Sequence, residues 1–86
     1  MNLEFTDAAL EDYRHWQADH PEKTARIKAL LANVLETPFA GLGKPEPLRH
    51  DLQGCWPRRI DARHRLVYKV TGESVIVLAC RYHYGN

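Results

Sequence analysis

The first apolar positions of the chain alternate with polar ones. Leu3 and Phe5 fall on one side of residues 2–6, and this period of two predicts a short strand. Thr6 or Asp7 then offers a side chain that can cap a following helix. The chain is therefore expected to begin with a strand that runs directly into a helix.

Two amphipathic helices are predicted next. Apolar positions recur near helical spacing in residues 8–18, and they follow the pattern i, i+3, i+4, i+7, i+8 closely in residues 21–36. Pro21 separates the two helices, because proline interrupts a helix but suits its first turn. The second helix has the clearest apolar stripe, which consists of Ile27, Leu30, Leu31, Val34 and Leu35.

A loop and a run of strands are predicted for the rest of the chain. Residues 37–47 contain 3 prolines and 2 glycines, which favours a long loop. Residues 48–52 are a possible short strand, and alternation predicts three more strands over residues 55–61, 64–70 and 74–82. This order predicts an α+β two-layer sandwich, with the N-terminal strand and two helices packed on one face of a mainly antiparallel sheet.

Alternation also sorts the side chains of the last strands between the two faces of the sheet. The side facing the helices is expected to carry Trp56, Arg58, Ile60, Leu66, Tyr68, Val70, Ile76, Leu78, Cys80 and Tyr82. The open face is expected to carry Val67, Lys69, Val75, Val77 and Ala79, together with Arg59, Arg65, Arg81 and His83. Three arginines and one histidine are thus predicted to share an open, basic surface.

Composition narrows the class of protein. A chain of 86 residues can bury only a small core, so residues 1–86 are expected to form a single domain without a large buried cofactor. Cys55 and Cys80 are expected to be buried small hydrophobes rather than a disulfide framework. The chain shows no apolar signal segment and no stretch approaching the roughly 18 apolar residues that span a bilayer, so we expect a cytoplasmic protein with no membrane partner.

The net charge of +1 conceals an uneven distribution. Residues 1–43 carry 4 Lys/Arg against 7 Asp/Glu, a net of −3, whereas residues 44–86 carry 8 against 4, a net of +4. A basic second half suits a polyanionic partner, although an ordinary solvated surface explains a charge of +4 equally well.

The predicted open face and the preceding loop together offer acid–base chemistry at a phosphate. Guanidinium groups pair with phosphate oxygens, and the imidazole of His83 could donate a proton to a leaving alkoxide. Glu46, which has a proline on each side, is the carboxylate available as a base. Each residue taken singly is more often a solvated surface residue, so only the combination points to a site. His15, His20 and His64 are given no role.

A metal site and a cysteine nucleophile are both disfavoured. Cys80 and His83 are three positions apart on a predicted strand, so their side chains are expected to point to opposite faces. The sequence has no second closely spaced pair of metal ligands and no phosphate-binding glycine motif. Neither a metal nor another cofactor is expected.

With these residues in place, the chain strongly resembles the YoeB toxins of the RelE superfamily, the toxic halves of bacterial toxin–antitoxin pairs. The resemblance covers nearly the whole chain, and its segments include Gly43-Lys44-Pro45-Glu46-Pro47-Leu48, Arg58-Arg59-Ile60, His64-Arg65-Leu66-Val67-Tyr68 and Ala79-Cys80-Arg81-Tyr82-His83-Tyr84. It implies a RelE-like fold and a metal-independent endoribonuclease that cuts messenger RNA in the ribosomal A site. The implied reaction is attack of the 2′-hydroxyl on the adjacent phosphorus.

The resemblance also implies roles for individual residues and partners. Glu46 matches the family's general base, Arg65 its phosphate-stabilising arginine, His83 its general acid and Tyr84 a tyrosine that holds the substrate. Candidates for contact with RNA or the ribosome are Lys44, Arg49, Arg58, Arg59 and Arg81. The implied partners are a YefM-like antitoxin, the ribosome with its messenger RNA, and a second copy of the chain.

One alternative function stays open at this point, and two features depart from the family pattern. A non-catalytic RelE-superfamily protein could bind the ribosome, an antitoxin or gyrase, although the joint presence of Glu46, Arg65 and His83 argues against lost chemistry. The family typically stops at the terminal tyrosine, whereas this chain continues with Gly85-Asn86. Pro57 lies in a predicted strand and cannot donate a ladder hydrogen bond, which predicts an edge strand or a bulge.

Overall fold

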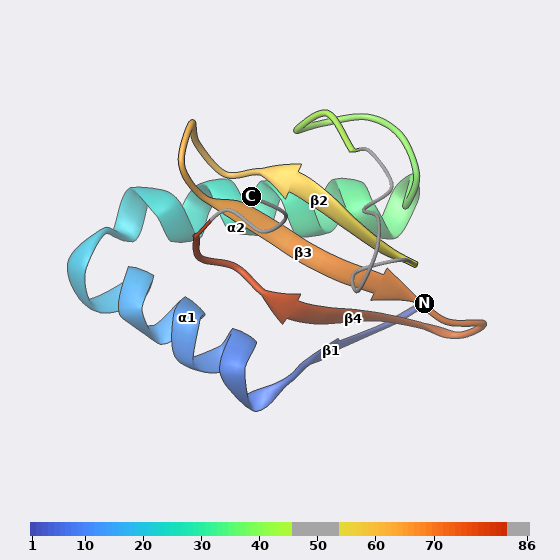
Figure 1. The fold of residues 1–86 in the computed structure, drawn as a ribbon, viewed down its shortest axis with the longest axis horizontal. Helices are drawn as coiled ribbons and strands as arrows, with labels where there is room; N and C mark the ends of the chain where they lie inside the picture. Colours follow the sequence, from blue (N-terminus) through green and yellow to red (C-terminus); the bar gives the residue numbers. More distant parts are fainter. Residues whose placement is uncertain (46–53, 83–86) are drawn as a thin grey trace.

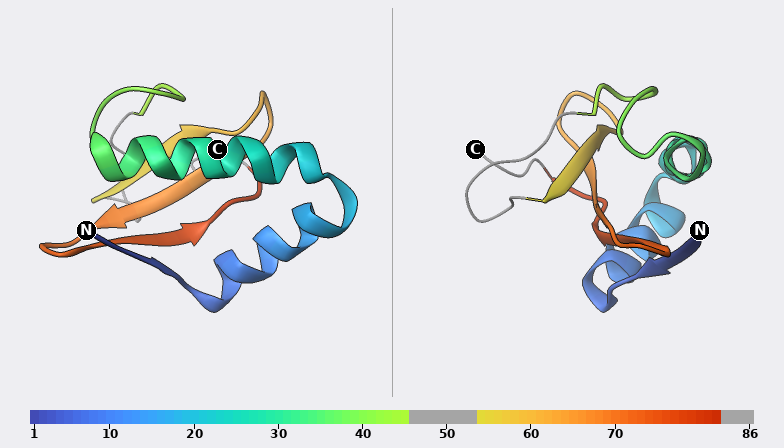
Figure 2. Two further views of the ribbon diagram at one scale, coloured as in Figure 1. Left: turned by 180° about the vertical axis from the view of Figure 1, so that it is seen from behind. Right: turned by 90° about the vertical axis from the view of Figure 1, so that its right-hand side faces the viewer.

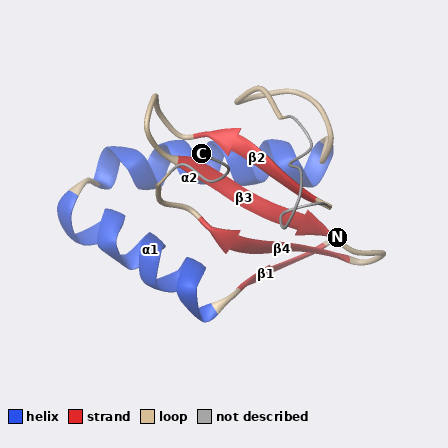
Figure 3. Cartoon of the chain, in the orientation of Figure 1, coloured by secondary structure: helices blue, strands red, loops and turns tan. Residues whose placement is uncertain are grey.

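The computed structural model describes residues 1–45 and 54–82, which form two helices and a four-stranded sheet (Figure 1). The elements are β1 (Asn2–Phe5), α1 (Asp7–Asp19), α2 (Pro21–Glu36), β2 (Cys55–Arg59), β3 (Arg65–Val70) and β4 (Ser74–Ala79). The strand order is β1-β4-β3-β2, with β1 parallel to β4 and the other pairs antiparallel. Both helices lie on one side of the sheet (Figures 2 and 3), so the predicted α+β sandwich is confirmed.

The helix boundaries follow from local chemistry. The Oγ1 of Thr6 accepts a hydrogen bond from the Ala9 N–H at 3.1 Å and caps α1, so Thr6, and not Asp7, is the cap of the two that the sequence offered. His20 ends this helix, its N–H bonding to the Trp16 carbonyl at 2.8 Å. Pro21 then opens α2, where its fixed φ and missing N–H carry no penalty.

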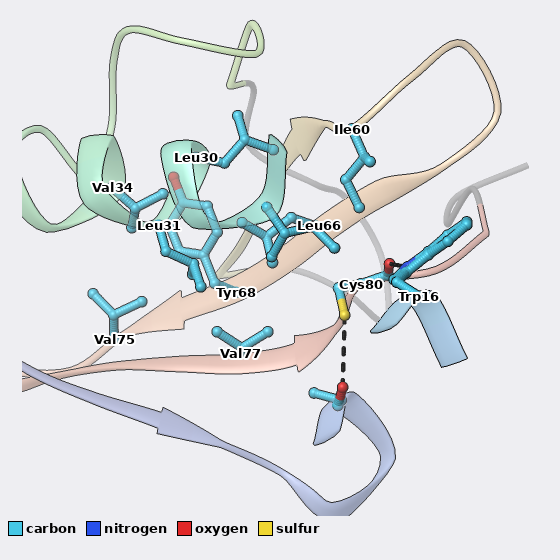
Figure 4. Close-up of a cluster of buried hydrophobic side chains, with 12 residues drawn as sticks. Trp16, Leu30, Leu31, Val34, Ile60, Leu66, Tyr68, Val75, Val77 and Cys80 are labelled. Atoms are coloured by element: carbon cyan, nitrogen blue, oxygen red, sulfur yellow. Dashed lines mark hydrogen bonds between the residues drawn. The ribbon is translucent and has the colours of Figure 1, made fainter. Parts of the chain in front are cut away.

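The main core lies between α2 and the sheet (Figure 4). The stripe on α2 contributes Ile27, Leu30 and Val34, which are fully buried. These side chains meet Leu66 and Tyr68 of β3, whose predicted direction toward the helices is confirmed. On the other side of the sheet Cys55, Val67 and Ala79 form a second, smaller buried cluster.

Strand β4 does not keep the alternation that the sequence predicts. Val75 and Val77, expected on the open face, are fully buried in the helix-facing core, whereas Ile76 and Leu78 are only partly buried. The register shifts because Val67 pairs with Ala79 while Tyr68 pairs with Val77, leaving Leu78 as an extra residue. A β-bulge of this kind restarts the alternation, so Cys80 faces the helices although the even positions before it do not.

Two further predictions concern the edge of the sheet and the loop beside it. Among the described strands β2 lies at the edge of the sheet, so Pro57 has one neighbouring strand there and its missing N–H leaves no second ladder incomplete; the predicted edge position is confirmed for this part of the chain. The possible strand over residues 48–52 lies outside the described residues. Neither α1 nor α2, the helices of the described part, is long and apolar enough to cross a membrane.

Candidate functional site

Two arginines lie opposite each other at one end of the β2–β3 pair. Arg59 and Arg65 are register partners, the first exposed and the second partly buried. None of the ion pairs found within residues 1–45 and 54–82 involves either of them. Like charges placed directly opposite destabilise an antiparallel pair, so stability of the sheet does not explain this arrangement. An anionic partner bound between the two guanidinium groups would explain why they lie opposite each other.

The side chain of Arg65 is oriented by the turn between β2 and β3. Its Nη1 donates to the carbonyls of Asp61 at 2.7 Å and His64 at 3.1 Å. No acceptor for its other guanidinium nitrogens occurs in the described part of the chain. A guanidinium fixed through one nitrogen can present the rest of its fork to a phosphate.

Residues 80–82 are fastened to α1 just after β4 ends. The Cys80 N–H donates to Asp12 Oδ2 at 3.1 Å. The Trp16 Nε1–H donates to the Cys80 carbonyl at 2.7 Å, a bond that Figure 4 shows. Both backbone polar groups of Cys80 are therefore satisfied by side chains of a single helix. The Cys80 Sγ also lies 3.6 Å from the Ala9 carbonyl of this helix.

The turn before β3 fastens the same segment from the other side. The Tyr82 N–H donates to His64 Nδ1 at 2.7 Å, and the Tyr82 carbonyl accepts from the Arg65 N–H at 2.9 Å. We call the four groups that bond residues 80–82 the C-terminal clamp; they are the Asp12 carboxylate, the Trp16 indole, the His64 imidazole and the Arg65 N–H. This clamp brings the end of the described chain next to Arg65.

Tyr82 is not a core residue, and this corrects the sequence prediction. Its side chain is 54% exposed and its φ is +67°, a left-handed conformation that is uncommon for an aromatic residue. β4 ends at Ala79, so strand alternation no longer applies three residues later. The Arg81 guanidinium instead lies over the Tyr82 ring, with Cζ 4.7 Å from the ring centroid.

Arg58 is the second correction, because it is fully buried rather than available to RNA. Its guanidinium makes five hydrogen bonds: Nε donates to the Tyr68 hydroxyl, Nη1 to Asn33 Oδ1 and the Leu42 carbonyl, and Nη2 to the Thr37 and Ala40 carbonyls. Tyr68 in turn donates to the Pro38 carbonyl. The alternation of β2 correctly predicted that Arg58 points toward the helices. The acceptors that allow its burial there are mostly backbone carbonyls of the loop after α2.

The loop over residues 37–45 is thus wrapped around Arg58 and tied to β2. The Gly43 carbonyl accepts from the Arg59 N–H at 2.9 Å, and Leu42 N–H donates to Asn33 Oδ1 at 2.9 Å. Gly43 has φ +83°, and a Cβ there would lie 2.9 Å from the Arg59 backbone nitrogen. The loop therefore contacts Arg59 through Gly43, three residues before Glu46.

An ion pair joins the turn between β2 and β3 to helix α2. Lys23 Nζ of α2 lies 2.9 Å from Asp61 Oδ2, and Asp61 Oδ1 accepts the backbone N–H groups of Arg63 and His64. Partial burial alone would raise the pKa of the Asp61 carboxyl, but these hydrogen bonds and the charge of Lys23 outweigh it and lower the pKa to about 2. The turn that orients Arg65 is accordingly stabilised by an ionised Asp61.

The two cysteines are free and buried, as expected. Burial, reinforced by the charge of Asp12, raises the pKa of the Cys80 thiol to about 12. Cys80 therefore packs as a small apolar group beside the clamp and is not a nucleophile at neutral pH.

The structure describes only part of the predicted site. Glu46, Arg49, His83 and Tyr84 lie outside the described residues. Lys44 and Arg59 are exposed, Arg81 and Arg65 are partly buried, and Arg58 is buried. His64 had no predicted role, and no local pattern in the sequence signals one, because its contacts with Trp16 and Tyr82 join residues far apart in the chain.

Comparison with known proteins places this geometry in a family. Residues 5–84 match the model of the YoeB-like toxin of bacterial type II toxin-antitoxin systems. Toxin YoeB from Streptomyces coelicolor is 49% identical over 84 residues, covering 98% of this chain and 100% of the relative. The solved YoeB/ParE toxin from Agrobacterium tumefaciens superimposes with a TM-score of 0.95 at 46% identity, covering 98% and 100% of the two chains. The YoeB dimer from Staphylococcus aureus does so with a TM-score of 0.91 at 36% identity, and the YoeB-YefM complex from that organism with 0.89, each covering 98% of both chains.

The α+β sandwich with a basic sheet end is therefore that of a RelE-like toxin. The chain belongs to the family of YoeB-like toxins of bacterial type II toxin-antitoxin systems. The resemblance expected from the sequence is confirmed, as is the fold class.

Proposed function

We propose that this toxin is a ribosome-dependent endoribonuclease that cuts messenger RNA in the A site and so inhibits translation. The observation that supports it most is the convergence of two anchored segments on one arginine pair. The loop that leads into Glu46 is bonded to Arg59, and the segment that leads into His83 is bonded to Arg65. Since Arg59 and Arg65 are register partners, the predicted base and acid both follow segments fastened at the same end of the sheet.

The proposed reaction needs no water and no metal. Glu46 takes the proton of a ribose 2′-hydroxyl, whose oxygen then attacks the adjacent phosphorus. The bond from phosphorus to the 5′-oxygen breaks, and His83 donates a proton to that oxygen. The products are a 2′,3′-cyclic phosphate and a 5′-hydroxyl end, and Tyr84 helps to hold the substrate.

Arg65 supplies the electrostatic stabilisation in this scheme. Negative charge accumulates on the non-bridging phosphate oxygens as the phosphorane forms, and a pre-oriented guanidinium stabilises it more than it stabilises the starting diester. The hydrogen bonds from Arg65 Nη1 to two backbone carbonyls provide that orientation before RNA arrives. An arginine without these bonds would lose side-chain entropy when RNA binds, and this cost would reduce the stabilisation that it provides.

RNA and ribosome contact is proposed for the remaining basic residues of the site. Arg59 and Lys44 are exposed, and Arg81 and Arg49 complete the set. Arg58 is left out because its burial and its five internal hydrogen bonds occupy it fully. Contacts of this kind are made to phosphates, so binding should weaken steeply as salt concentration rises.

The proposed partners follow from solved relatives. A YoeB-YefM complex and a YoeB dimer are known from Staphylococcus aureus. We propose that this chain likewise binds a YefM-like antitoxin and forms a homodimer, and that it acts in the cytoplasm, where ribosomes are.

The proposal is tested by mapping 5′ ends on messenger RNA in programmed ribosomes after addition of the protein. Codon-positioned cuts that carry a 5′-hydroxyl are expected with the native chain and not with Glu46→Ala or His83→Ala. Arg65→Ala should also lose cleavage, and Arg63→Ala is its matched control, because Arg63 is an exposed arginine on the turn just before Arg65 and should leave cleavage largely unchanged. Absence of any cut with the native chain, despite binding to the ribosome, would favour a non-catalytic binding protein instead.

A further inference from the structure

His64 bonds the residue that immediately precedes the proposed acid. Its Nδ1 lies 2.7 Å from the Tyr82 backbone nitrogen, which donates the hydrogen bond. An imidazole nitrogen can accept only when it carries no proton, so the contact exists only with neutral His64 in the tautomer protonated at Nε2. A proton on Nδ1 would set two donors against each other.

Tyr82 depends on this bond more than a strand residue would. It lies beyond the end of β4 in a left-handed conformation with φ +67°, and its ring is exposed. Such a conformation is strained for an L-residue and persists only where neighbouring contacts impose it. Within the described residues, those contacts are the His64 Nδ1 and the Arg65 N–H on the backbone, and the Arg81 guanidinium and the His64 imidazole against the ring.

The imidazole itself is held in place by aromatic rings. Its ring centroid lies 4.7 Å from that of Trp16 in an edge-to-face arrangement and 5.7 Å from that of Tyr82. His15 and His20 also pack edgewise on Trp16, at 5.3 and 5.8 Å. Trp16 is 3% exposed and its indole N–H is bonded to Cys80, so this frame cannot easily move.

The charges that face His64 come from three parts of the chain. Asp61 and Arg63 belong to its own turn, Lys23 to α2, and Arg81 to the clamped segment. Burial lowers the pKa of His64, the charge of Asp61 opposes this, and the three cations reinforce it, so that the pKa lies below its ordinary value of 6.5. His64 is therefore neutral at pH 7, and it takes up a proton only at a lower pH than an ordinary histidine does.

From this geometry we propose that His64 is a positioning residue for the toxin's reaction: neutral His64 fixes Tyr82, and hence the point from which the chain continues to His83 and Tyr84, and protonation of His64 releases it. The inference rests on the proposed function. It adds a pH-sensitive element that is distinct from the proton transfers of the proposed base and acid.

Two substitutions separate the bond from the titration. In His64→Asn, the side-chain carbonyl oxygen takes the place of Nδ1 as an acceptor but binds no proton near neutral pH. In His64→Leu the acceptor is lost and the packing volume is largely kept. We expect His64→Asn to cleave within about threefold of the native rate at pH 7.5, and His64→Leu to be slower by roughly 10- to 100-fold, the size of effect that a small misplacement of a reacting group produces.

The decisive measurement is single-turnover cleavage of ribosome-bound messenger RNA between pH 5.5 and 8, for the native chain and both variants. Each variant is compared with the native chain at the same pH, which removes the ribosome's own pH dependence. The native rate should fall on acidification with a limb that His64→Asn lacks. His15→Leu is the matched control, because His15 packs on the same Trp16 ring without a bond to residues 80–82, and it should keep the native profile.

Nuclear magnetic resonance tests the bond itself. The ¹⁵N shifts of His64 should show an unprotonated Nδ1 at pH 7.5, and the Tyr82 amide shift should titrate with the same midpoint as His64 in the native chain and not in His64→Asn. Thermal unfolding of His64→Leu identifies the fraction folded under assay conditions, so its rate is expressed per folded molecule.

The outcomes distinguish this inference from the proposed function. If the native chain cleaves and folded His64→Leu cleaves equally fast, or if His64→Asn keeps the acidic limb, the positioning role is wrong while the ribonuclease stands. A protonated Nδ1 in the neutral imidazole would also overturn it. If the native chain does not cleave at all, the proposed function fails, and the role of His64 in the reaction fails with it.

Discussion

Arg58 provides the sharpest test of how the fold positions the site. The sequence places it among candidates for RNA contact, whereas the structure buries it completely under the loop of residues 37–45. The two interpretations predict opposite results for its replacement. An RNA-binding arginine would affect activity with little change in stability, and a loop-holding arginine would affect stability first.

The expected size follows from its five hydrogen bonds. Hydrogen bonds to a charged group are each worth about 1.5–3 kcal/mol, but their sum overstates the net effect because burial of a guanidinium is itself costly. Removing one side of such a buried network typically costs about 3–5 kcal/mol. A chain of 86 residues has about 4–13 kcal/mol of total stability, so this is a large share.

We therefore expect Arg58→Met to lower the free energy of unfolding by about 3 kcal/mol or more, since methionine fills the space but withdraws the guanidinium from the Leu42, Thr37 and Ala40 carbonyls. The free energy of unfolding of Arg58→Lys should lie between those of the native chain and Arg58→Met, because one ammonium cannot reach all the acceptors. Urea unfolding followed by circular dichroism measures this directly. Hydrogen exchange at Leu42 and Arg59, whose N–H groups bond Asn33 and Gly43, reports on the loop.

Arg59→Met is the matched control, because Arg59 is the exposed neighbour on the same strand. Its stability should change by no more than about 0.5 kcal/mol, while RNA cleavage should weaken and become less sensitive to salt. If the free energy of unfolding of Arg58→Met lies within about 1 kcal/mol of the native value, the guanidinium does not hold the loop and the role given to Arg58 is wrong.

Four other outcomes are expected. Arg65→Ala should slow single-turnover cleavage by roughly 10²–10³-fold, about 2–4 kcal/mol of transition-state stabilisation, and a loss of only a few-fold would exclude a phosphate-stabilising role. The pKa of Asp61 is lowered from 3.8 to about 2, so its carboxylate contributes about 2 kcal/mol above pH 3.8, lost as pH falls toward 2; urea unfolding of native and Asp61→Asn chains between pH 2 and 7 should show this difference shrinking in acid, and a constant difference would contradict it. Gly43→Ala should destabilise the chain more than Gly54→Ala, because both glycines have positive φ but a Cβ at Gly43 meets Arg59 N at 2.9 Å and one at Gly54 meets no described residue within 4 Å; equal midpoints in urea would be inconsistent with the close approach. With a pKa of about 12, the Cys80 thiol should resist iodoacetamide at pH 8 until urea unfolds the chain, and rapid alkylation of the folded protein would show that it is accessible.

Local patterns in the sequence determined the elements and the class of protein. The period of the apolar residues set the two helices and the strands, Thr6 and Pro21 set the helix starts, and Pro57 marked the edge strand. These features depend on neighbours within a few positions, where backbone sterics and hydrogen bonding decide the outcome. The segments shared with YoeB toxins are likewise contiguous, so the order of residues along the chain is enough to indicate the family.

Tertiary packing decided what alternation could not. The bulge at Leu78 reversed the expected faces of Val75 and Val77, because a strand gains an unpaired residue only in relation to its partner strand. Arg58 became a buried anchor because loop carbonyls, far from it in sequence, converge on its guanidinium. His64 acquired its position for the same reason: α1 brings Trp16 to one side of its ring, and the end of β4 brings the Tyr82 N–H to its Nδ1. Hydrogen-bond partners separated by many residues leave no local period in a sequence, and only the folded chain shows them together.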